Sequence, residues 1–296
     1  MCGIVGLFAK NSEMRASLGS YVVPMIVCMG DRGQDSAGLA VFSEQNSKNS
    51  RRINLFSRDN SYPWDTLSEK LSQELNCDFN ALDNHAVIIA SEDPQHVINW
   101  LSEYYSELFV LSIGKAIDVY KDIGHPREIA DKYRFNELKG THCVGHTRMA
   151  TESAVTPYHS HPFIAGEDLC LVHNGSLSNH HNLRRMLEMR GIPFETDNDT
   201  EAVCRFVQWR LQEGDSIEEA LQKTFEDVDG FYTLLIGTAD RIVLVRDAFA
   251  CKPAVIAETG DYVAIGSEFR TMAHLPDIEN AHLYEPKPEE IYSWKV

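Results

Sequence analysis

The chain has 296 residues, with 27 Lys and Arg against 44 Asp and Glu, so its net charge is −17. This acidic balance, without a run of basic residues, argues against nucleic acid as a partner, and no stretch reaches the roughly 18 apolar residues that a membrane-spanning helix needs. The seven cysteines are odd in number and widely spread, which favours reduced thiols in a cytoplasmic protein.

The first zone of the chain covers residues 2–44. Its opening run, residues 4–9, is apolar and strand-like, and it is too short and lacks the basic flank of a signal peptide. Apolar side chains at helical spacing predict a helix over residues 18–29, and a β-rich run is expected at residues 39–42. Residues 45–62 are polar and rich in Ser and Asn, so they are predicted to form a loop or an edge excursion.

The second zone, residues 63–140, has a different pattern. Leucines at positions 67, 71 and 75 mark one amphipathic helix, and a second helix is predicted over residues 97–108. Between them, the apolar sequence HAVIIAS is typical of a buried strand. The alternation of helices and strands predicts an α/β insertion within a larger domain, and the sequence assigns it no function.

From residue 141 onward, short strands predominate and helices interrupt them. Helices are predicted over residues 182–190 and 200–212, the second with Asp199 as its N-cap, and Ser216 with Glu219 predicts a capping box for a third. Four β-rich runs follow, in the order GFYTLLIG, RIVLVRD, PAVIAE and YVAIGSEF. Consecutive hairpins of this kind build antiparallel sheets, so the predicted class is α+β or layered α/β/β/α.

A cysteine stands directly after the initiator methionine. Methionine is removed readily when the next residue is small, so Cys2 is expected to become the mature N-terminus, with a thiol and a free α-amine on one residue. An α-amine titrates at about 7.7 to 8.0, much nearer neutrality than a lysine, and it can take the thiol proton and return it to a leaving group. Cys2 is therefore a candidate nucleophile with its own base.

Two further segments carry groups that a thiol amidohydrolase needs. In GHTRMAT, the guanidinium of Arg148 suits a carboxylate, and Thr151 adds a hydroxyl donor. In LVHNGSLSN, the amide of Asn174 and the backbone N–H of Gly175 come directly after a β-rich run. Two such donors, aimed at a developing oxyanion, are what acyl transfer requires.

Two more segments add charged groups. In TDNDTEA, Asp199 stands at a helix start, where its carboxylate would receive a substrate ammonium group, although an aspartate there also serves as a simple cap. In DRGQDSAG, Arg32 and Asp35 lie beside a glycine turn near the first strand. Each of the four segments is short, but their combination in this order, after an N-terminal cysteine, is specific.

This combination resembles the class II glutamine amidotransferases, the cysteine branch of the N-terminal nucleophile hydrolases. The matching motifs are CGIVG, RG with DSAG, GHTR, HNG and DTE. The resemblance implies a four-layer αββα sandwich of the N-terminal nucleophile hydrolase type. Residues 2–296 would form one amidotransferase domain, with residues 63–140 as an α/β insertion within it.

The resemblance also implies roles for the candidate residues. The catalytic set is Cys2, Asn174 and Gly175, and the substrate-binding set is Arg148, Asp199, Thr151 and Arg32. In this scheme the thiol attacks the γ-amide of glutamine with its own α-amine as base, and the amide and glycine N–H hold the oxyanion. Arg148 binds the substrate α-carboxylate, and Asp199 binds the substrate α-ammonium group.

The segment from KAIDVYKDIG to LVHNGSLSN is similar to free-standing amidotransferase subunits of glutamate-synthase-like complexes, including the small subunit of N-methylglutamate synthase. The resemblance implies that ammonia passes to partner synthase subunits; no cofactor is expected in this chain, and flavin or iron–sulfur groups are implied only for partners. Two alternatives stay open: a stand-alone γ-glutamyl amide hydrolase and a non-catalytic assembly subunit. Paired histidines invite a metal site, but packing or surface roles are favoured, and no metal is expected.

Overall fold

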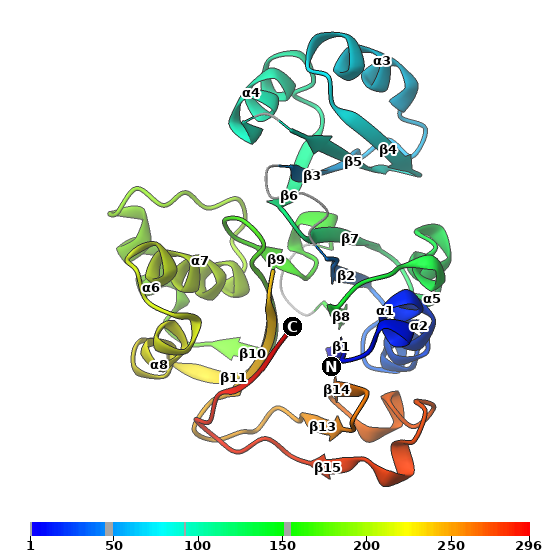
Figure 1. Ribbon diagram of the computed structural model, residues 1–296. Coiled ribbons are helices and arrows are strands. Elements are labelled where there is room, and N and C mark those ends of the chain that lie inside the picture. The colour runs from blue at the N-terminus through cyan, green and yellow to red at the C-terminus, as the bar shows by residue number, and fades with distance from the viewer. Residues whose placement is uncertain (1, 45–49, 92, 151–154) are drawn as a thin grey trace.

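The computed structural model describes residues 2–44, 50–91, 93–150 and 155–296 (Figure 1). Within these ranges the strands form three sheets, and the ladders between neighbouring strands are antiparallel. All seven cysteines are free thiols. None of the helices in the described ranges combines the length and the apolar composition that a bilayer crossing requires.

Two of the sheets make up the main body. The larger sheet runs in the order β15 (His282–Tyr284), β13 (Val255–Glu258), β14 (Tyr262–Gly266), β1 (Gly3–Ala9), β8 (His142–Arg148), β2 (Ser36–Phe42) and β7 (Ile117–Ile123). The smaller sheet runs in the order β16 (Tyr292–Lys295), β12 (Arg241–Arg246), β11 (Gly230–Thr238), β10 (Cys170–Leu177) and β9 (Phe163–Ile164). The N-terminal strand therefore lies inside the larger sheet, paired on both sides.

Apolar side chains from both sheets meet in a core between them, which includes Phe8 of β1, Val144 of β8 and Leu235 of β11. The outer helices are α1 (Ser12–Ala16), α2 (Leu18–Cys28) and α5 (Pro126–Lys132) on the larger sheet, and α6 (His180–Glu188), α7 (Asp199–Gln212) and α8 (Ile217–Asp227) on the smaller one (Figure 1). The order helix, sheet, sheet, helix confirms the predicted αββα sandwich.

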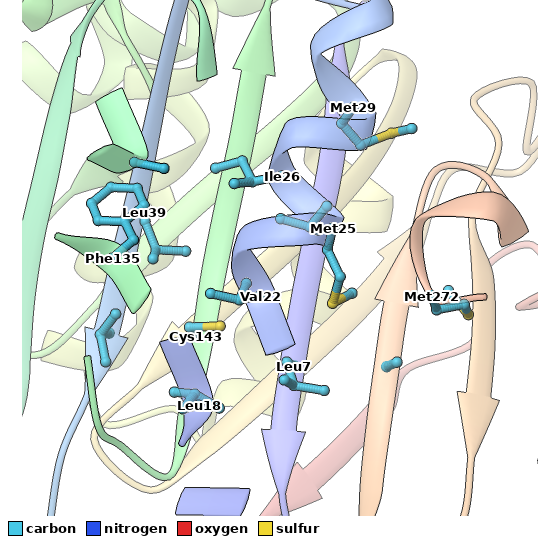
Figure 2. Packing of buried hydrophobic residues seen from close by; sticks show 14 of the residues in the cluster. Leu7, Leu18, Val22, Met25, Ile26, Met29, Leu39, Phe135, Cys143 and Met272 are labelled. Carbon is cyan, nitrogen blue, oxygen red and sulfur yellow. The ribbon is translucent and has the colours of Figure 1, made fainter. Parts of the chain in front are cut away.

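Helix α2 is the main cover of the larger sheet. Its apolar face carries Val22, Met25 and Ile26, which pack with Leu7 of β1 and Cys143 of β8 (Figure 2). These side chains are buried and follow the helical spacing that predicted a helix over residues 18–29. The prediction is confirmed, with the last residue of that range in a short 3₁₀ turn, Met29–Asp31.

Gly19 lies where α2 contacts a second 3₁₀ turn, Phe135–Glu137, and a Cβ there would sit 1.8 Å from the carbonyl oxygen of Phe135. Because that neighbour is backbone, Gly19→Ala is expected to lower the free energy of unfolding by about 3 kcal/mol, as overpacking does. Urea denaturation measures it, with Gly260→Ala as the control because a Cβ at Gly260 meets open space. Equal stability losses in the two variants would contradict this packing.

The C-terminal half follows the predicted order of helices and strands. The capping box of Ser216 and Glu219 is present at the start of α8, and the four β-rich runs are β11 to β14. The N-cap of α7 is Asn198, not Asp199 as predicted, because the Asn198 side chain accepts the hydrogen bond from the Thr200 N–H. The side chain of Asp199 is therefore available for contacts outside the helix.

The third sheet forms a separate unit, at the top of Figure 1. Its strand order is β4 (Asp78–Leu82), β5 (His85–Ala90), β3 (Arg51–Phe56) and β6 (Phe109–Gly114), and its helices are α3 (Trp64–Glu74) and α4 (Pro94–Tyr104). The prediction of a loop over residues 45–62 is wrong at β3, which is an inner strand. Polar neighbours concealed it, although Ile53 and Leu55 point into the core of this unit.

Residues 63–140 are divided between two parts of the structure. Helices α3 and α4 and strands β4 to β6 belong to the third sheet's unit, whereas β7 extends the larger sheet and α5 packs on its core. The unit also takes in β3, which precedes this range. Residues 63–140 thus contribute to both the third sheet's unit and the larger sheet. Whether this range is an insertion stays a prediction.

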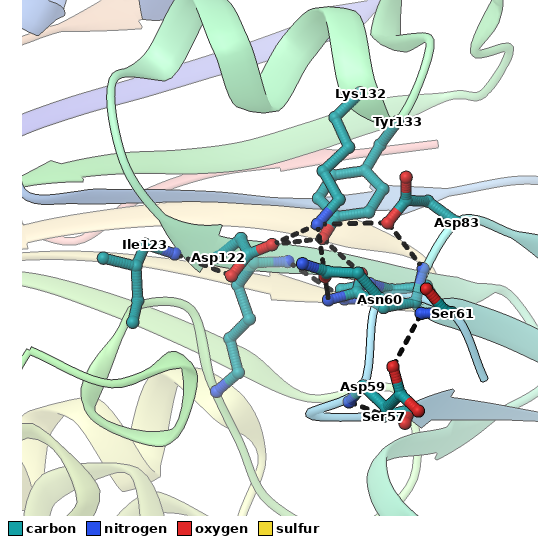
Figure 3. A network of polar contacts seen from close by, with 12 residues as sticks. Ser57, Asp59, Asn60, Ser61, Asp83, Asp122, Ile123, Lys132 and Tyr133 are labelled. Carbon is teal, nitrogen blue, oxygen red and sulfur yellow. Dashed lines mark hydrogen bonds and ion pairs between the residues drawn. The ribbon is translucent and has the colours of Figure 1, made fainter.

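A polar network joins the third sheet's unit to the main body (Figure 3). The Asp122 carboxylate on β7 lies 2.9 Å from Lys132 Nζ and 2.6 Å from the Tyr133 hydroxyl. The same lysine reaches Asp83 at 3.1 Å, and the same hydroxyl lies 2.7 Å from Asn84 Oδ1. Burial acts to raise the pKa of Asp122, but its hydrogen bonds outweigh burial and lower it. The two parts are therefore joined through Lys132 and Tyr133, and the ionised Asp122 carboxylate holds both of these side chains in place.

Candidate active site around Cys2

Cys2 precedes β1, whose register places Gly3 opposite Thr147 of β8. The carbonyl oxygen of Cys2 accepts hydrogen bonds from Arg32 Nε at 2.9 Å and from Asn174 Nδ2 at 3.2 Å. Its Sγ lies 3.8 Å from the carbonyl oxygen of Met149. The strand and these two donors hold the cysteine at a point where the larger and smaller sheets meet.

Arg32 approaches Cys2 from the end of the turn after α2. Its guanidinium also forms an ion pair with Glu268 at 2.5 Å. The next residue must be small, because a Cβ on Gly33 would lie 2.6 Å from the backbone carbon of Arg148. These contacts of Arg32 support the N-terminal segment, and its predicted contact with substrate stays a prediction.

Asn174 lies on β10, and its amide has a fixed orientation. Its Nδ2 is 3.2 Å from the Ser267 hydroxyl, which in turn accepts a hydrogen bond from the Ile4 N–H. Its Oδ1 is 3.2 Å from His146 Nε2, which is also 3.2 Å from the carbonyl oxygen of His173. Both neighbours of that nitrogen are acceptors, so we assign the proton to Nε2. His146 thereby turns the Asn174 N–H groups toward Cys2.

The electrostatic state of His146 is set by burial, which lowers its pKa to about 3. The ring is neutral at physiological pH and carries a single N–H. Since only one nitrogen of a neutral ring carries a proton, the Nε2–H of His146 donates to the Asn174 Oδ1 and the His173 carbonyl oxygen, and Nδ1 has no proton. The neutral imidazole is a hydrogen-bond donor for the Asn174 carbonyl.

Gly175 follows Asn174 with a φ of +148°, a conformation that glycine adopts readily. A Cβ at this position would lie 1.8 Å from the carbonyl oxygen of Phe231 on the neighbouring strand β11. Space and backbone conformation therefore both require glycine. The backbone N–H of this residue stands next in the chain to the Asn174 amide, as the sequence pattern predicts.

Asp199 is turned from the first turn of α7 toward the end of β10. Its Oδ2 accepts the Leu177 N–H at 3.1 Å, and its Oδ1 lies 3.3 Å from the Thr200 hydroxyl and 3.7 Å from His173 Nδ1. Burial acts to raise the pKa of this carboxyl group, but the interactions with His173 and Leu177 outweigh it and lower the pKa to about 2. Asp199 is an anion at neutral pH, and 24% of its side chain is exposed.

Arg148 is the last residue of β8 and is buried. The backbone around it is held by Asp35, whose N–H donates to the Arg148 carbonyl at 3.0 Å and whose carboxylate accepts the Ala150 N–H at 2.7 Å. These two bonds flank Met149, the residue whose carbonyl lies nearest the Cys2 thiol in the described contacts. Thr151, the remaining predicted substrate-binding residue, lies outside the described residues.

Sequence reasoning missed a buried histidine cluster behind the site. Thr200 Oγ1 lies 3.0 Å from His161 Nε2 and 3.1 Å from His173 Nδ1, and the rings of His146 and His161 stack at 4.0 Å. The cluster connects the Asn174 amide to the Asp199 carboxylate. In the sequence these histidines suggested packing or surface roles, and nothing in their spacing predicted that they would meet. Within the described part of the chain, no group of three or more His, Cys, Asp or Glu residues converges as metal ligands would.

The structure thus brings four predicted residues, Cys2, Arg32, Asn174 and Gly175, to one place through direct contacts or chain adjacency. Arg148 comes directly after Thr147, the residue that pairs with Gly3 in the sheet. Asp199 is connected to Asn174 through its bond to Leu177 on β10 and through the histidine cluster. A cysteine beside an amide donor, in a fold that also carries a buried arginine and an ionised carboxylate at these positions, suits acyl transfer from a small zwitterionic amide.

Known proteins resemble this chain in sequence and in fold. A family model described as a glutamine amidotransferase domain matches residues 146–274. The glutamine amidotransferase-like protein GlxB of Rhizobium meliloti (strain 1021) is 41% identical over 296 residues, which cover 99% of this chain and 98% of that protein.

Two solved structures share the fold. The glutamine phosphoribosylpyrophosphate amidotransferase from B. subtilis, complexed with ADP and GMP, has a TM-score of 0.61 at 18% identity, covering 99% of this chain and 49% of its own. A structure described as the allosteric regulatory enzyme of purine biosynthesis has a TM-score of 0.63 at 19% identity, covering 99% and 47%. The chain spans about half the length of these two proteins. With the identity to GlxB over nearly the whole of both chains, these findings show that the chain belongs to the class II glutamine amidotransferases, a family of enzymes.

Proposed function

We propose that this enzyme hydrolyses the γ-amide of glutamine through a γ-glutamyl thioester on Cys2. The observation that carries the proposal is the hydrogen bond between Asn174 Nδ2 and the Cys2 carbonyl, which sets an oriented amide donor beside the candidate nucleophile. A donor held at the residue that carries the thiol is suited to an oxyanion that forms when the thiol attacks. The ionised carboxylate of Asp199 supports an amino-acid substrate.

In the proposed reaction, removal of the initiator methionine frees the α-amine of Cys2, which takes the thiol proton. The sulfur attacks the γ-carbonyl carbon, and the Asn174 amide and the Gly175 N–H hold the resulting oxyanion. The C–N bond then breaks, and the protonated α-amine gives its proton to the leaving ammonia. Water attacks the thioester, which releases glutamate and restores the thiol.

The substrate would be held at its α-carbon by two opposite charges. Arg148 would bind the α-carboxylate, for which a planar guanidinium is suited, and Asp199 would bind the α-ammonium group. Thr151 and Arg32 are further candidates for substrate contacts. Because both proposed ion pairs are made to the groups on the α-carbon, binding would recognise the amino-acid end of the substrate and not its side-chain amide.

We further propose that the ammonia passes to partner synthase subunits of glutamate synthase or N-methylglutamate synthase type in the cytoplasm. The family resemblance supports such a subunit role, and flavin or iron–sulfur chemistry would belong to the partners. Copurification followed by glutaminase assays with and without recovered partners tests this step. Full activity without partners, with a preference for leaving groups larger than ammonia, would favour the stand-alone hydrolase instead.

The thioester has a direct test in the unmodified protein. We expect intact mass spectrometry of acid-quenched turnover to detect a γ-glutamyl adduct on a chain that lacks Met1, with the adduct mapped by peptide analysis to Cys2. Samples quenched before addition of glutamine serve as the control. Turnover by a chain that retains Met1, or an adduct on another cysteine, would contradict the mechanism.

A further inference from the structure

A cavity of about 820 Å³ lies between the third sheet's unit and the main body. On one side it is lined by α4 and β6, with Ile98, Val110 and Ser112 among the lining residues. On the other side it is lined by β7, β9 and α7, with Lys121 and Phe163. None of the candidate catalytic or substrate-binding residues that the structure describes lines it, which separates it from the described contacts of Cys2.

Lys121 is a buried cationic residue in the lining of this cavity. Its Nζ donates to the carbonyl oxygens of Ser160 at 3.2 Å and Pro162 at 3.3 Å. An ammonium group has three donors, and among the described residues no carboxylate comes within ion-pair distance of this one. Burial lowers its pKa to about 8, so most of the population is still charged at pH 7. Glu195 and Glu201 stabilise this charge only from beyond ion-pair distance, and a ligand anion at the third N–H would stabilise it at close range.

Ser112 adds a second unused group. Its side chain is 3% exposed, and its hydroxyl has no hydrogen-bond partner in the described structure. Ser112 lines the same cavity from β6, an edge strand of the third sheet. Buried hydroxyl groups are normally bonded, so an unbonded one in a cavity indicates a missing partner. A hydroxyl and an ammonium together favour a ligand group that accepts hydrogen bonds and carries negative charge.

The acidic residues of the lining are already engaged. Glu201 accepts the N–H groups of Glu195 and Thr196 at 2.9 and 2.7 Å, and Arg205 pairs with Glu195 at 3.1 Å. Glu167 pairs with Arg51, which leaves its charge balanced. Arg205 Nε also lies 3.5 Å from Glu201. Among the described lining residues, Lys121 is thus a cation without a direct ion pair, and its third N–H is open to a ligand.

We propose that this cavity binds a small organic carboxylate with an apolar body. The carboxylate accepts hydrogen bonds from Lys121 Nζ and Ser112 Oγ, and the apolar body packs against Ile98, Val110 and Phe163. Cavities of this size, mainly apolar with a few convergent polar groups and at the junction of two units, are the usual form of small-molecule sites. The inference is independent of the function proposed for Cys2.

Occupancy of the cavity is expected to affect glutamine turnover, because the two sites share supports. The carbonyls that Lys121 holds belong to Ser160 and Pro162, the residues on either side of His161 in the histidine cluster. Glu201, which lines the cavity, follows Thr200, which binds two rings of that cluster. A ligand that draws Lys121 toward itself would weaken its hydrogen bonds to the Ser160 and Pro162 carbonyls and so shift His161.

Calorimetric titration of the full chain tests the proposal with two probe pairs, 4-methylpentanoate with its amide and 3-phenylpropanoate with its amide. We expect the carboxylates to bind at least about tenfold more tightly than the amides, since hydrogen bonds to charged groups are the strong ones. Lys121→Met and Ser112→Ala are each expected to weaken carboxylate binding about tenfold, and Ser112→Ala serves if the lysine variant fails to fold. Lys115→Met, on the turn between β6 and β7, is the matched control and leaves binding unchanged.

Three outcomes would overturn the site: no heat with either carboxylate, equal binding of amides and carboxylates, or loss of binding in Arg148→Met but not in Lys121→Met. The last outcome would assign the probe to the substrate site instead. A glutaminase rate that is unchanged at saturating carboxylate would overturn the coupling between the two sites.

Discussion

Replacement of Cys2 by alanine is expected to lower the rate of glutamine hydrolysis at least about 10⁴-fold, because the variant lacks the sulfur that forms the thioester. The fold should persist, since the two shorter bonds at this residue are made by its backbone carbonyl and the thiol makes only the 3.8 Å contact with Met149. Ammonia release measures the rate, and thermal unfolding measures the stability. Hydrolysis by Cys2→Ala at the parent rate would refute the mechanism.

The matched control is Cys28→Ala, because Cys28 is also partly exposed and lies at the end of α2. This variant should keep the parent rate. An N-terminal extension that survives processing is expected to reproduce the loss seen for Cys2→Ala, because it blocks the α-amine without touching the thiol. If the extended chain stays fully active, the α-amine is not the base.

The second large effect is expected at Asn174. Replacement by alanine should lower kcat by about 10² to 10³-fold, the usual result of removing one oxyanion donor, while KM changes little because the oxyanion exists only after attack. Asn174→Asp keeps the size of the side chain but lacks the amide N–H, so it should lower kcat by a similar factor. Steady-state kinetics with glutamine separates the two constants.

Asn179→Ala provides the comparison. Asn179 is five residues after Asn174, and its side chain bonds the backbone of Asp227 and Asp229 instead of Cys2. It should leave kcat unchanged. A rise in KM with an intact kcat for the Asn174 variants would instead mean that this amide binds the substrate in its ground state.

Much of this architecture could be predicted from local sequence, since the information lies within a few residues. The helix over residues 18–29 and the capping box at Ser216 rest on spacing and end signals that the chain carries locally. The β3 strand was missed because its polar flanks resemble a loop, and the α7 cap was placed one residue late because Asn198 and Asp199 are both good cap residues.

The candidate site was predictable as a set of residues but not as a geometry. The motifs identified Cys2, Asn174 and Gly175, and the structure adds the contacts of Cys2 with Arg32 and Asn174, while the catalytic and binding roles stay predictions. The partnership of His146 with Asn174 joins two strands of different sheets, 28 positions apart. Such pairs depend on the stacking of the sheets, which no local pattern encodes, and the same holds for the cavity at Lys121.

The first turn of α7 has a consequence for protein engineering. Asp199 contacts the end of β10, Thr200 contacts two histidines and Glu201 holds the backbone at residues 195–196. A helix turns by about 100° per residue, so neighbours along one turn face different directions. The exposed stretch before the helix looks like a convenient place for grafted peptides, but a graft there would disturb three regions at once. The turn at Gly214, where a Cβ meets open space, is the better insertion point.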